Sequence, residues 1–167
     1  MTPSDIVRSV IVNHVAVDMA VFPDRLWADI AKSFGGYDVW TAAGYKVDEI
    51  DDPTALLAYR MTLEKDGAIA DQRVVRVTEK DEGARRISLF ADFLSQPHGL
   101  LVFASYQAHE IAGGARYTID CHSRMGIEPG AGTVVAKIAE LQKSFDTYLN
   151  DSLHKLKAKL EAEQAAS

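Results

Sequence analysis

The segment AGTVVAKIAELQKSFDTYLNDSLHKLKAKLEAE, residues 131–163, is the longest stretch of the chain with a single periodicity. Its apolar residues recur at steps of three and four, which places them in one stripe along an α-helix. They are Val134, Ile138, Leu141, Phe145, Leu149, Leu153, Leu156 and Leu160. Such a helix would be roughly 45–50 Å long, and its apolar stripe needs a partner surface.

The residues that precede this helix change periodicity several times. Residues 6–21 are rich in β-branched side chains and predict a long first strand. Residues 22–34 predict a helix, because Pro23 suits its first turn and Gly35-Gly36 its end. A shorter helical or irregular piece is expected from 37 to 43, around Trp40.

From Gly44 onward the apolar residues alternate with period two, which indicates β-strands. The predicted strands are 45–50, 55–64, 68–79, 84–94, 100–111 and 115–127, separated by turn-forming residues. Consecutive strands joined by short turns form an antiparallel meander. We therefore expect an α+β fold: a seven-stranded antiparallel sheet wrapped around the C-terminal helix, with two short helices between strands one and two.

Four short segments and this element order point to a known fold. They are Phe22-Pro23-Asp24-Arg25-Leu26-Trp27, Trp40, Val75-Arg76-Val77-Thr78-Glu79-Lys80-Asp81-Glu82 and Glu128-Pro129-Gly130. The chain resembles, over nearly its whole length, the helix-grip fold of the START/Bet v 1 superfamily (SRPBCC), in its polyketide cyclase/dehydrase branch. The resemblance implies an internal pocket between sheet and helix. Many members carry a Glu where this chain has Val75, so a role of that carboxylate cannot be transferred.

Composition limits the class of protein. The chain has 167 residues, 47% of them hydrophobic and 25% charged, which is ordinary for a globular domain. We expect one domain over 1–167 with an ordered core of about 6–163. The sequence shows neither an apolar run of about 20 residues nor a signal peptide. Cys121 is the single cysteine, which excludes an internal disulfide and fits a cytoplasmic location.

The charge and the motifs bear on partners and cofactors. A net charge of −6 argues against nucleic acid or an anionic membrane as the main partner. Because the sequence has no apolar run of about 20 residues, we also expect no membrane insertion. The five histidines have no metal-ligand spacing, and the paired glycines form no phosphate loop. We therefore expect no metal and no cofactor. The sequence leaves the oligomeric state open.

Turn positions predict which side chains face the helix. A two-residue turn at Gly113-Gly114 would pair Ala108 with Ile119 and Tyr106 with Cys121, placing these small or apolar residues on the concave side. Carried back through the earlier turns, the concave side receives Phe93, Ala91, Leu89, Ile87, Val77, Val75, Arg73, Asp71, Ile69, Leu63, Met61, Tyr59 and Leu57. A one-residue slip would instead turn Gln72 and Val74 inward.

The candidate catalytic residues are Asp71, Arg73 and His14. Arg73 would bind a carboxylate, phenolate or enolate oxygen, while Asp71 would move a proton. The alternative is a purely structural ion pair. His14 would be an acid or base near neutral pH, but in the first strand Asn13 and His14 compete for the inward position.

The candidate ligand-binding residues are mostly apolar or weakly polar. They are Trp40, Tyr59, Met61, Leu89, Tyr106, Tyr117, Cys121, Ser123, Phe145 and Tyr148. A mainly apolar lining with few polar groups is typical of a small-molecule site. The alternative for the tyrosines and the cysteine is ordinary core packing.

Three functions follow as hypotheses. The first is binding of a hydrophobic, aromatic or polycyclic small molecule, with cofactor-independent cyclase, lyase or isomerase chemistry on a carbonyl compound. The second is a non-catalytic carrier or sensor of a lipid or quinone. The third is a protein-interaction module, for which an exposed apolar patch would be the signature.

Overall fold

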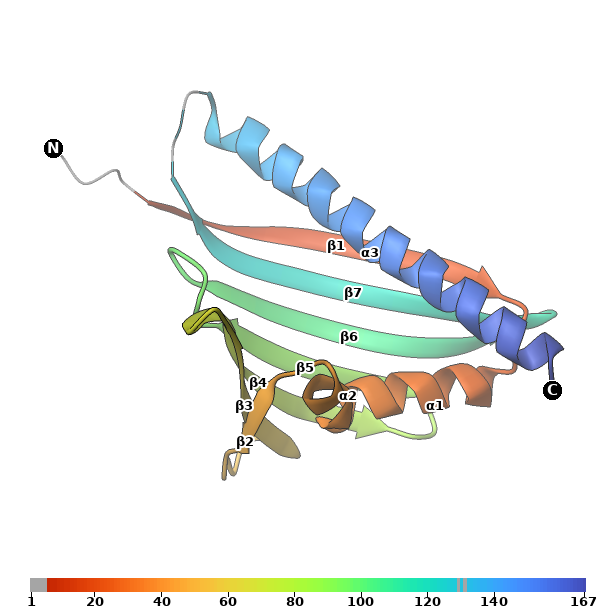
Figure 1. Cartoon of the computed structure of the whole chain (residues 1–167). Coiled ribbons are helices and arrows are strands. Elements are labelled where there is room, and N and C mark those ends of the chain that lie inside the picture. The colour runs from red at the N-terminus through yellow and green to blue at the C-terminus, as the bar shows by residue number, and fades with distance from the viewer. Residues whose placement is uncertain (1–5, 129, 131) are drawn as a thin grey trace, which may run out of the picture.

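The computed structural model describes residues 6–128, 130 and 132–167 of the chain. Within them the chain forms three helices and seven strands, all in one antiparallel sheet. The strands are β1 (Val7–Met19), β2 (Lys46–Glu49), β3 (Leu57–Lys65), β4 (Ala68–Asp81), β5 (Arg86–Phe93), β6 (Leu100–Ile111) and β7 (Gly114–Ile127). Their order is β1-β7-β6-β5-β4-β3-β2 (Figure 1). The predicted helix-grip architecture is confirmed.

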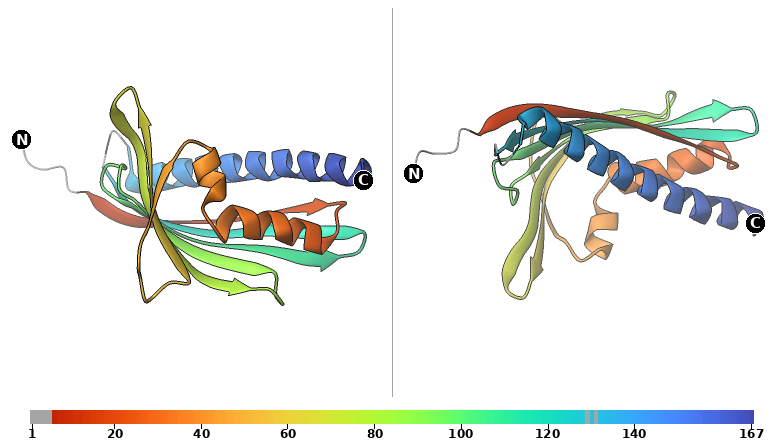
Figure 2. Two further views of the ribbon diagram at one scale, coloured as in Figure 1. Left: turned by 60° about the horizontal axis from the view of Figure 1, so that its bottom comes forward. Right: turned by 90° about the horizontal axis from the view of Figure 1, so that it is seen from above.

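Two short helices connect β1 to β2. Helix α1 (Pro23–Phe34) begins at a proline, and it buries Leu26, Trp27 and Ile30 as its spacing predicts. Helix α2 (Asp38–Ala42) follows after three residues. Figure 2 shows both helices on the same side of the sheet as the long C-terminal helix, and the β3–β4 pair bent away from the other strands.

Helix α3 (Val134–Ala165) is the long element that the periodicity predicts. The Thr133 hydroxyl caps its start by accepting a hydrogen bond from the Ala136 N–H at 3.1 Å. The predicted start at Ala131, and Pro129 of the 128–130 segment, lie outside the described residues. In the described part of the chain, no helix is long and apolar enough to span a membrane.

Polar side chains of α3 bind the backbone along and just beyond β1. Gln142 donates to the Val12 carbonyl at 3.2 Å. At the other end, Glu161 accepts from the Ala20 N–H at 2.8 Å, and Gln164 bonds the same residue's carbonyl at 3.0 Å. These bonds hold α3 beside the edge of the sheet.

The two halves of α3 are packed differently. Leu153 and Leu160 are fully buried and belong to a core cluster with β1, β7 and α1. In the N-terminal half, Ile138, Leu141 and Phe145 are only half-buried, and they join neither of the two core clusters found among the described residues. The C-terminal half therefore fixes the helix, while the N-terminal half keeps apolar surface free.

The β6–β7 register corrects one prediction. Ala108 pairs with Tyr117 and Tyr106 with Ile119, two residues away from the predicted partners. The turn is Ala112-Gly113, with Gly113 at φ +83°, and Gly114 already belongs to β7. Because the error is an even number, every side chain stays on its predicted face.

A bulge corrects a second prediction. Leu63 pairs with Asp71, as the inward register requires, but Glu64 pairs with Ile69. The pairing skips one residue between them, and such a shift exchanges the faces. Ile69, predicted to face inward, is 56% exposed.

Candidate functional site

The concave face of the sheet gathers most of the predicted lining residues. Tyr59, Met61, Leu89, Tyr117, Cys121 and Ser123 are buried on this face, and Tyr106 and Trp40 are half-buried. Small side chains at Ala91, Ala104 and Ala108 alternate with the large ones. We call the concave face beneath the N-terminal half of α3 the concave site.

Asp71 and Arg73 both face inward, as the preferred register predicts. The Arg73 guanidinium lies 2.6 Å from the Asp71 carboxylate and 4.3 Å above the centre of the Phe93 ring. The Arg73 Nε atom is buried and lacks a hydrogen-bond partner in the described part of the chain. The pair is therefore held in place with one donor still unused.

Asp71 is an acceptor for three neighbours. Besides Arg73, the Tyr45 hydroxyl donates to it at 2.8 Å and the Ser95 hydroxyl at 3.3 Å. Burial by itself raises the pKa of Asp71, but the hydrogen bonds from Arg73 and Tyr45 outweigh it and hold the pKa below its usual value. The carboxylate is thus ionised at neutral pH and well satisfied.

The tyrosines fall into two environments. Tyr59 accepts a hydrogen bond from the Trp40 indole N–H at 3.0 Å, which ties α2 to β3. Tyr106 stacks on Phe34 of α1 with ring centres 3.8 Å apart. Burial raises the pKa of Tyr59, Tyr106 and Tyr117, so all three are neutral phenols.

The thiol of Cys121 is buried and unreactive. Burial raises its pKa, although the contact with the Ser123 hydroxyl at 3.7 Å acts in the opposite direction. A nucleophilic cysteine needs a lowered pKa. Cys121 and Ser123 are therefore better suited to lining the site than to attacking a ligand.

One predicted residue lies elsewhere. His14 is on the outer face, where its side chain is 64% exposed and contacts Asp120 at 2.5 Å; it cannot act inside the sheet. Tyr148 is near enough to Tyr106 and Tyr45 to contribute to their raised pKa, but it keeps 71% of its surface exposed and is not part of the buried lining. Phe145 is half-buried on α3. His14 fails because β1 alternates strictly and Asn13 takes the inward position.

Asn13 is the residue that sequence reasoning left undecided. It is 2% exposed and pairs with Cys121 across the β1–β7 ladder. Its side-chain N–H group donates to α3, and its Oδ1 atom is buried without a partner among the described residues. Ile11, Val15 and Val17 are apolar and, like Asn13, odd-numbered, so all four lie on the same face of β1. This alternation could have favoured Asn13 over His14 as the inward residue.

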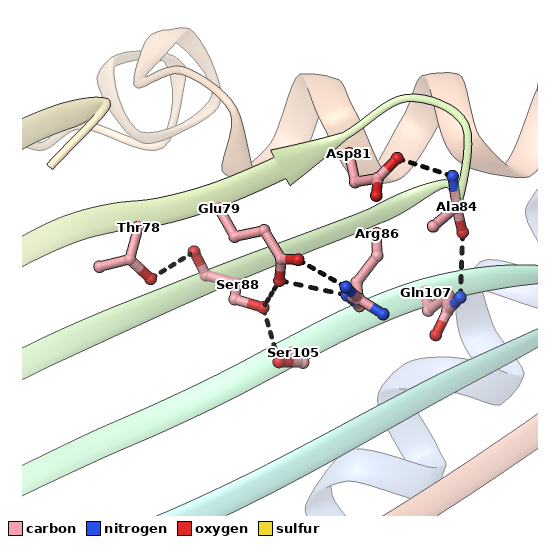
Figure 3. Close-up of polar contacts among 8 residues, drawn as sticks. All are labelled: Thr78, Glu79, Asp81, Ala84, Arg86, Ser88, Ser105 and Gln107. Carbon is pink, nitrogen blue, oxygen red and sulfur yellow. Dashed lines mark hydrogen bonds and ion pairs between the residues drawn. The ribbon is translucent and has the colours of Figure 1, made fainter.

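An open groove of about 500 Å³ lies on the opposite, outer face. It is lined by Thr78, Ser88, Phe90, Phe103, Ser105, Asp120 and His122, and also by Leu89 and Ala104, whose side chains are buried toward the concave face. Beside it Glu79 binds Arg86 at 2.5 Å, Ser88 donates to Glu79 at 2.8 Å and contacts Ser105 at 2.7 Å (Figure 3). These polar groups satisfy one another.

We place the candidate site on the concave face for a physical reason. In the described residues, the two buried side-chain polar atoms without a partner are Asn13 Oδ1 and Arg73 Nε, and both residues are concave. Buried polar groups are nearly always hydrogen-bonded. These two unpaired atoms distinguish the concave wall from the outer groove, whose polar groups bind one another.

The fold is shared with proteins of known structure. No protein-family model matches the sequence, and a search of curated proteins found no match. The structure is similar to that of Ara h 8.0201, with a TM-score of 0.60, 11% identity and coverage of 95% of this chain and 100% of that chain. Likeness at this identity concerns the fold, and the predicted resemblance to Bet v 1 is confirmed at that level.

Two further structures have the same fold. The Zhui aromatase/cyclase from Streptomyces sp. R1128 has a TM-score of 0.57 and 17% identity, with 95% of this chain and 97% of that chain covered. Norcoclaurine synthase from Thalictrum flavum, solved in complex with dopamine and hydroxybenzaldehyde, has a TM-score of 0.55 and 14% identity, with 95% and 88% covered.

Proposed function

We propose that this chain binds a flat aromatic or polycyclic small molecule in the concave site, with an oxygen of the ligand at Arg73. The observation that carries the proposal is the Arg73 side chain, which lies on an apolar wall with its Nε donor unused. The Phe93 ring below the guanidinium and the Asp71 carboxylate beside it fix its orientation. A preorganised donor in an apolar setting suits a carbonyl, carboxylate or phenolate oxygen.

The lining supports an aromatic ligand in particular. The rings of Trp40, Tyr59, Phe34 and Tyr106 border the concave face and pack on one another. On the same fold, norcoclaurine synthase is solved with two aromatic compounds, and Zhui is an aromatase/cyclase. These neighbours support the class of ligand; the residues of this chain carry the argument for where it binds.

Catalysis is the second candidate, and one observation favours it. Asp71 is ionised and lies against Arg73, so it could take a proton from a carbonyl compound while Arg73 stabilises the enolate oxygen. Cyclisation, elimination and isomerisation of a carbonyl compound through its enolate all begin with this step. Three existing hydrogen bonds weaken Asp71 as a base, and His14 is on the outer face. The geometry supports binding better than proton transfer.

The test uses the fluorescence of 2-naphthoate, which combines two fused rings with a carboxylate. Replacing Arg73 by Met removes the charge-assisted hydrogen bond, so we expect the affinity to fall about 10- to 100-fold. Arg73→Met leaves the Asp71 carboxylate without its ion-pair partner, which by itself destabilises the fold. The double variant Arg73→Met/Asp71→Asn, which removes both charges, is therefore measured as well.

Arg76 provides a matched control on the same strand. It binds Asp52 at 2.6 Å and lies over the Phe90 ring at 5.7 Å, but on the outer face. Arg76→Met should leave 2-naphthoate binding unchanged. If Arg76→Met weakens binding and Arg73→Met does not, the ligand occupies the outer groove and the proposal is wrong.

Mass spectrometry of candidate ligands after incubation with the protein then separates a carrier from an enzyme, because a carrier returns the ligands chemically unchanged.

A further inference from the structure

Asn13 presents an oxygen atom to the concave site. Its Nδ2 group donates to the Gln142 carbonyl at 3.1 Å and to the Asp146 carboxylate at 2.8 Å. A backbone carbonyl only accepts hydrogen bonds, so the amide cannot be turned round without losing both contacts. Oδ1 must therefore point away from α3's anchoring atoms, and it is buried without a partner among the described residues.

The neighbours of Asn13 do not satisfy this oxygen. Cys121 is its cross-strand partner, and the Cys121 thiol contacts Ser123 instead. Leaving a buried acceptor unpaired is unfavourable by about 1–3 kcal/mol.

We propose that the ligand donates a hydrogen bond, from a hydroxyl, a phenol or an N–H group, to Oδ1 of Asn13. This inference rests on the proposed function and extends it from one end of the ligand to the other. Arg73 would take an acceptor oxygen, and Asn13 a donor. The ligand class is then an aromatic compound with an acceptor at one end and a donor at the other.

The spacing of the two atoms indicates an elongated ligand. Asn13 is on β1 and Arg73 on β4, which are four strand steps apart in the sheet. At about 4.8 Å per step the path across the sheet is about 19 Å. The residue of β4 directly across from Asn13 is Val77, reached through Cys121, Ala104 and Leu89, and Arg73 lies four residues further along β4. A ligand that contacts both groups must therefore be elongated, and a probe of one or two rings tests one of them at a time.

The experiment compares two probes of equal size, 2-naphthol and 2-methylnaphthalene, by fluorescence titration. The measured quantity is the ratio of their dissociation constants, which cancels general effects on the site. In the wild-type chain the hydroxyl gains a bond to Asn13. In Asn13→Leu this gain is lost, and we expect the preference for 2-naphthol to fall about tenfold.

Two controls separate ligand contact from helix anchoring. Asp146→Ala removes one anchor of Asn13 but keeps Oδ1, so the preference should persist. Should Asn13→Leu fold poorly, the variant Asn13→Leu/Asp146→Leu removes both polar partners together and is measured in the same way. An unchanged ratio in the Leu variants overturns this inference while the Arg73 result still stands. Failure of both probes to bind the wild-type chain while 2-naphthoate binds overturns this inference alone, and failure of all three compounds overturns the proposed function as well.

Discussion

Arg73 and Arg76 lie three residues apart on β4 and have opposite surroundings. Each binds an aspartate and covers a phenylalanine ring. Asp52, the partner of Arg76, is also held by Thr54 in a surface turn, whereas the pair of Arg73 and Asp71 faces the concave site. The same side-chain chemistry therefore stabilises the outer surface in one case and prepares a binding group in the other.

Gly114 is fixed by the close approach of β1 and not by a turn. A Cβ atom at this position would lie 2.0 Å from the Met19 carbonyl oxygen. Gly114→Ala should therefore force the β1–β7 ladder apart and destabilise the protein by about 2 kcal/mol or more. Urea denaturation of the purified variant measures this loss.

Gly113→Ala is the matched comparison. Gly113 has φ +83° and open space around its Cα atom, so an alanine there suffers only backbone strain of about 1–2 kcal/mol. A larger loss for Gly113→Ala than for Gly114→Ala would contradict this assignment of the two glycines.

The pair of glycines also shows what the sequence could not decide. A Gly-Gly dipeptide is a strong turn signal, and it predicted the turn one residue too late at each end of the loop. The close contact of Gly114 with Met19 belongs to the tertiary structure and leaves no local mark. The face assignments in β6 and β7 were still right, because a register error of two residues leaves every side chain on the same face.

At the scale of elements, the C-terminal half of α3 packs into the core, and the N-terminal half lies over the concave site. Leu153 is buried in the core cluster, whereas Leu141 is half-buried and joins no core cluster among the described residues. Leu153→Ala should cost about 3 kcal/mol of unfolding free energy, and Leu141→Ala less than half of that. Both variants make the same chemical change in the same helix, so helix propensity cancels.

Thermal and urea unfolding of these two variants, together with 2-naphthoate titration, checks the division of α3. Leu141→Ala should alter the affinity for the probe, because Leu141 belongs to the half-buried apolar stripe in the N-terminal half of α3, beneath which we place the concave site. Leu153→Ala should alter stability alone. Equal losses of stability in both variants would show that the N-terminal half is packed as tightly as the C-terminal half.

The predictions were right where a periodic pattern of apolar residues extends over many residues. They were wrong where a single extra residue in a strand shifts the alternation of its two faces. The apolar stripe of α3 and the alternation in β3 to β7 were sufficient for the fold, including the inward position of Asp71 and Arg73. Ile69 was misassigned, because a bulge carries no residue signature in this sequence. His14 and Asn13 were left undecided because both are polar, although the apolar odd-numbered residues Ile11, Val15 and Val17 already favoured Asn13 as the inward residue.

At the scale of the whole molecule, acid should unfold the protein through its ion-paired carboxylates. Hydrogen bonds from Thr54 and then Arg76 lower the pKa of Asp52 to about 2, and the pKa values of Asp18, Glu79 and Glu82 are also lowered, by Arg116, Arg86 and Trp27 respectively. A carboxylate whose pKa is lower in the folded chain than in the unfolded chain stabilises the fold at pH values above its unfolded pKa, which is 3.8 for Asp. This stabilisation is lost as the pH falls through the folded-state pKa.

We therefore expect the urea midpoint to be nearly constant from pH 7 to 5 with respect to these groups and to fall between about pH 4 and 2. Asp52→Asn, which does not titrate, should show a smaller fall over the same range than the wild-type chain. Identical pH profiles for the two proteins would exclude Asp52 as a contributor.

The placement of α3 beside β1 has a consequence for aggregation of the protein. β1 is a 13-residue edge strand with exposed Val10 and Val12, the kind of edge to which another chain can add a strand. Gln142 occupies the Val12 carbonyl on this edge. A helix that lifted away as a whole would leave β1 open to intermolecular pairing and fibre growth. Motion confined to the N-terminal half of α3 would release Gln142 from Val12, while the bonds of Glu161 and Gln164 to Ala20 would still hold the C-terminal half.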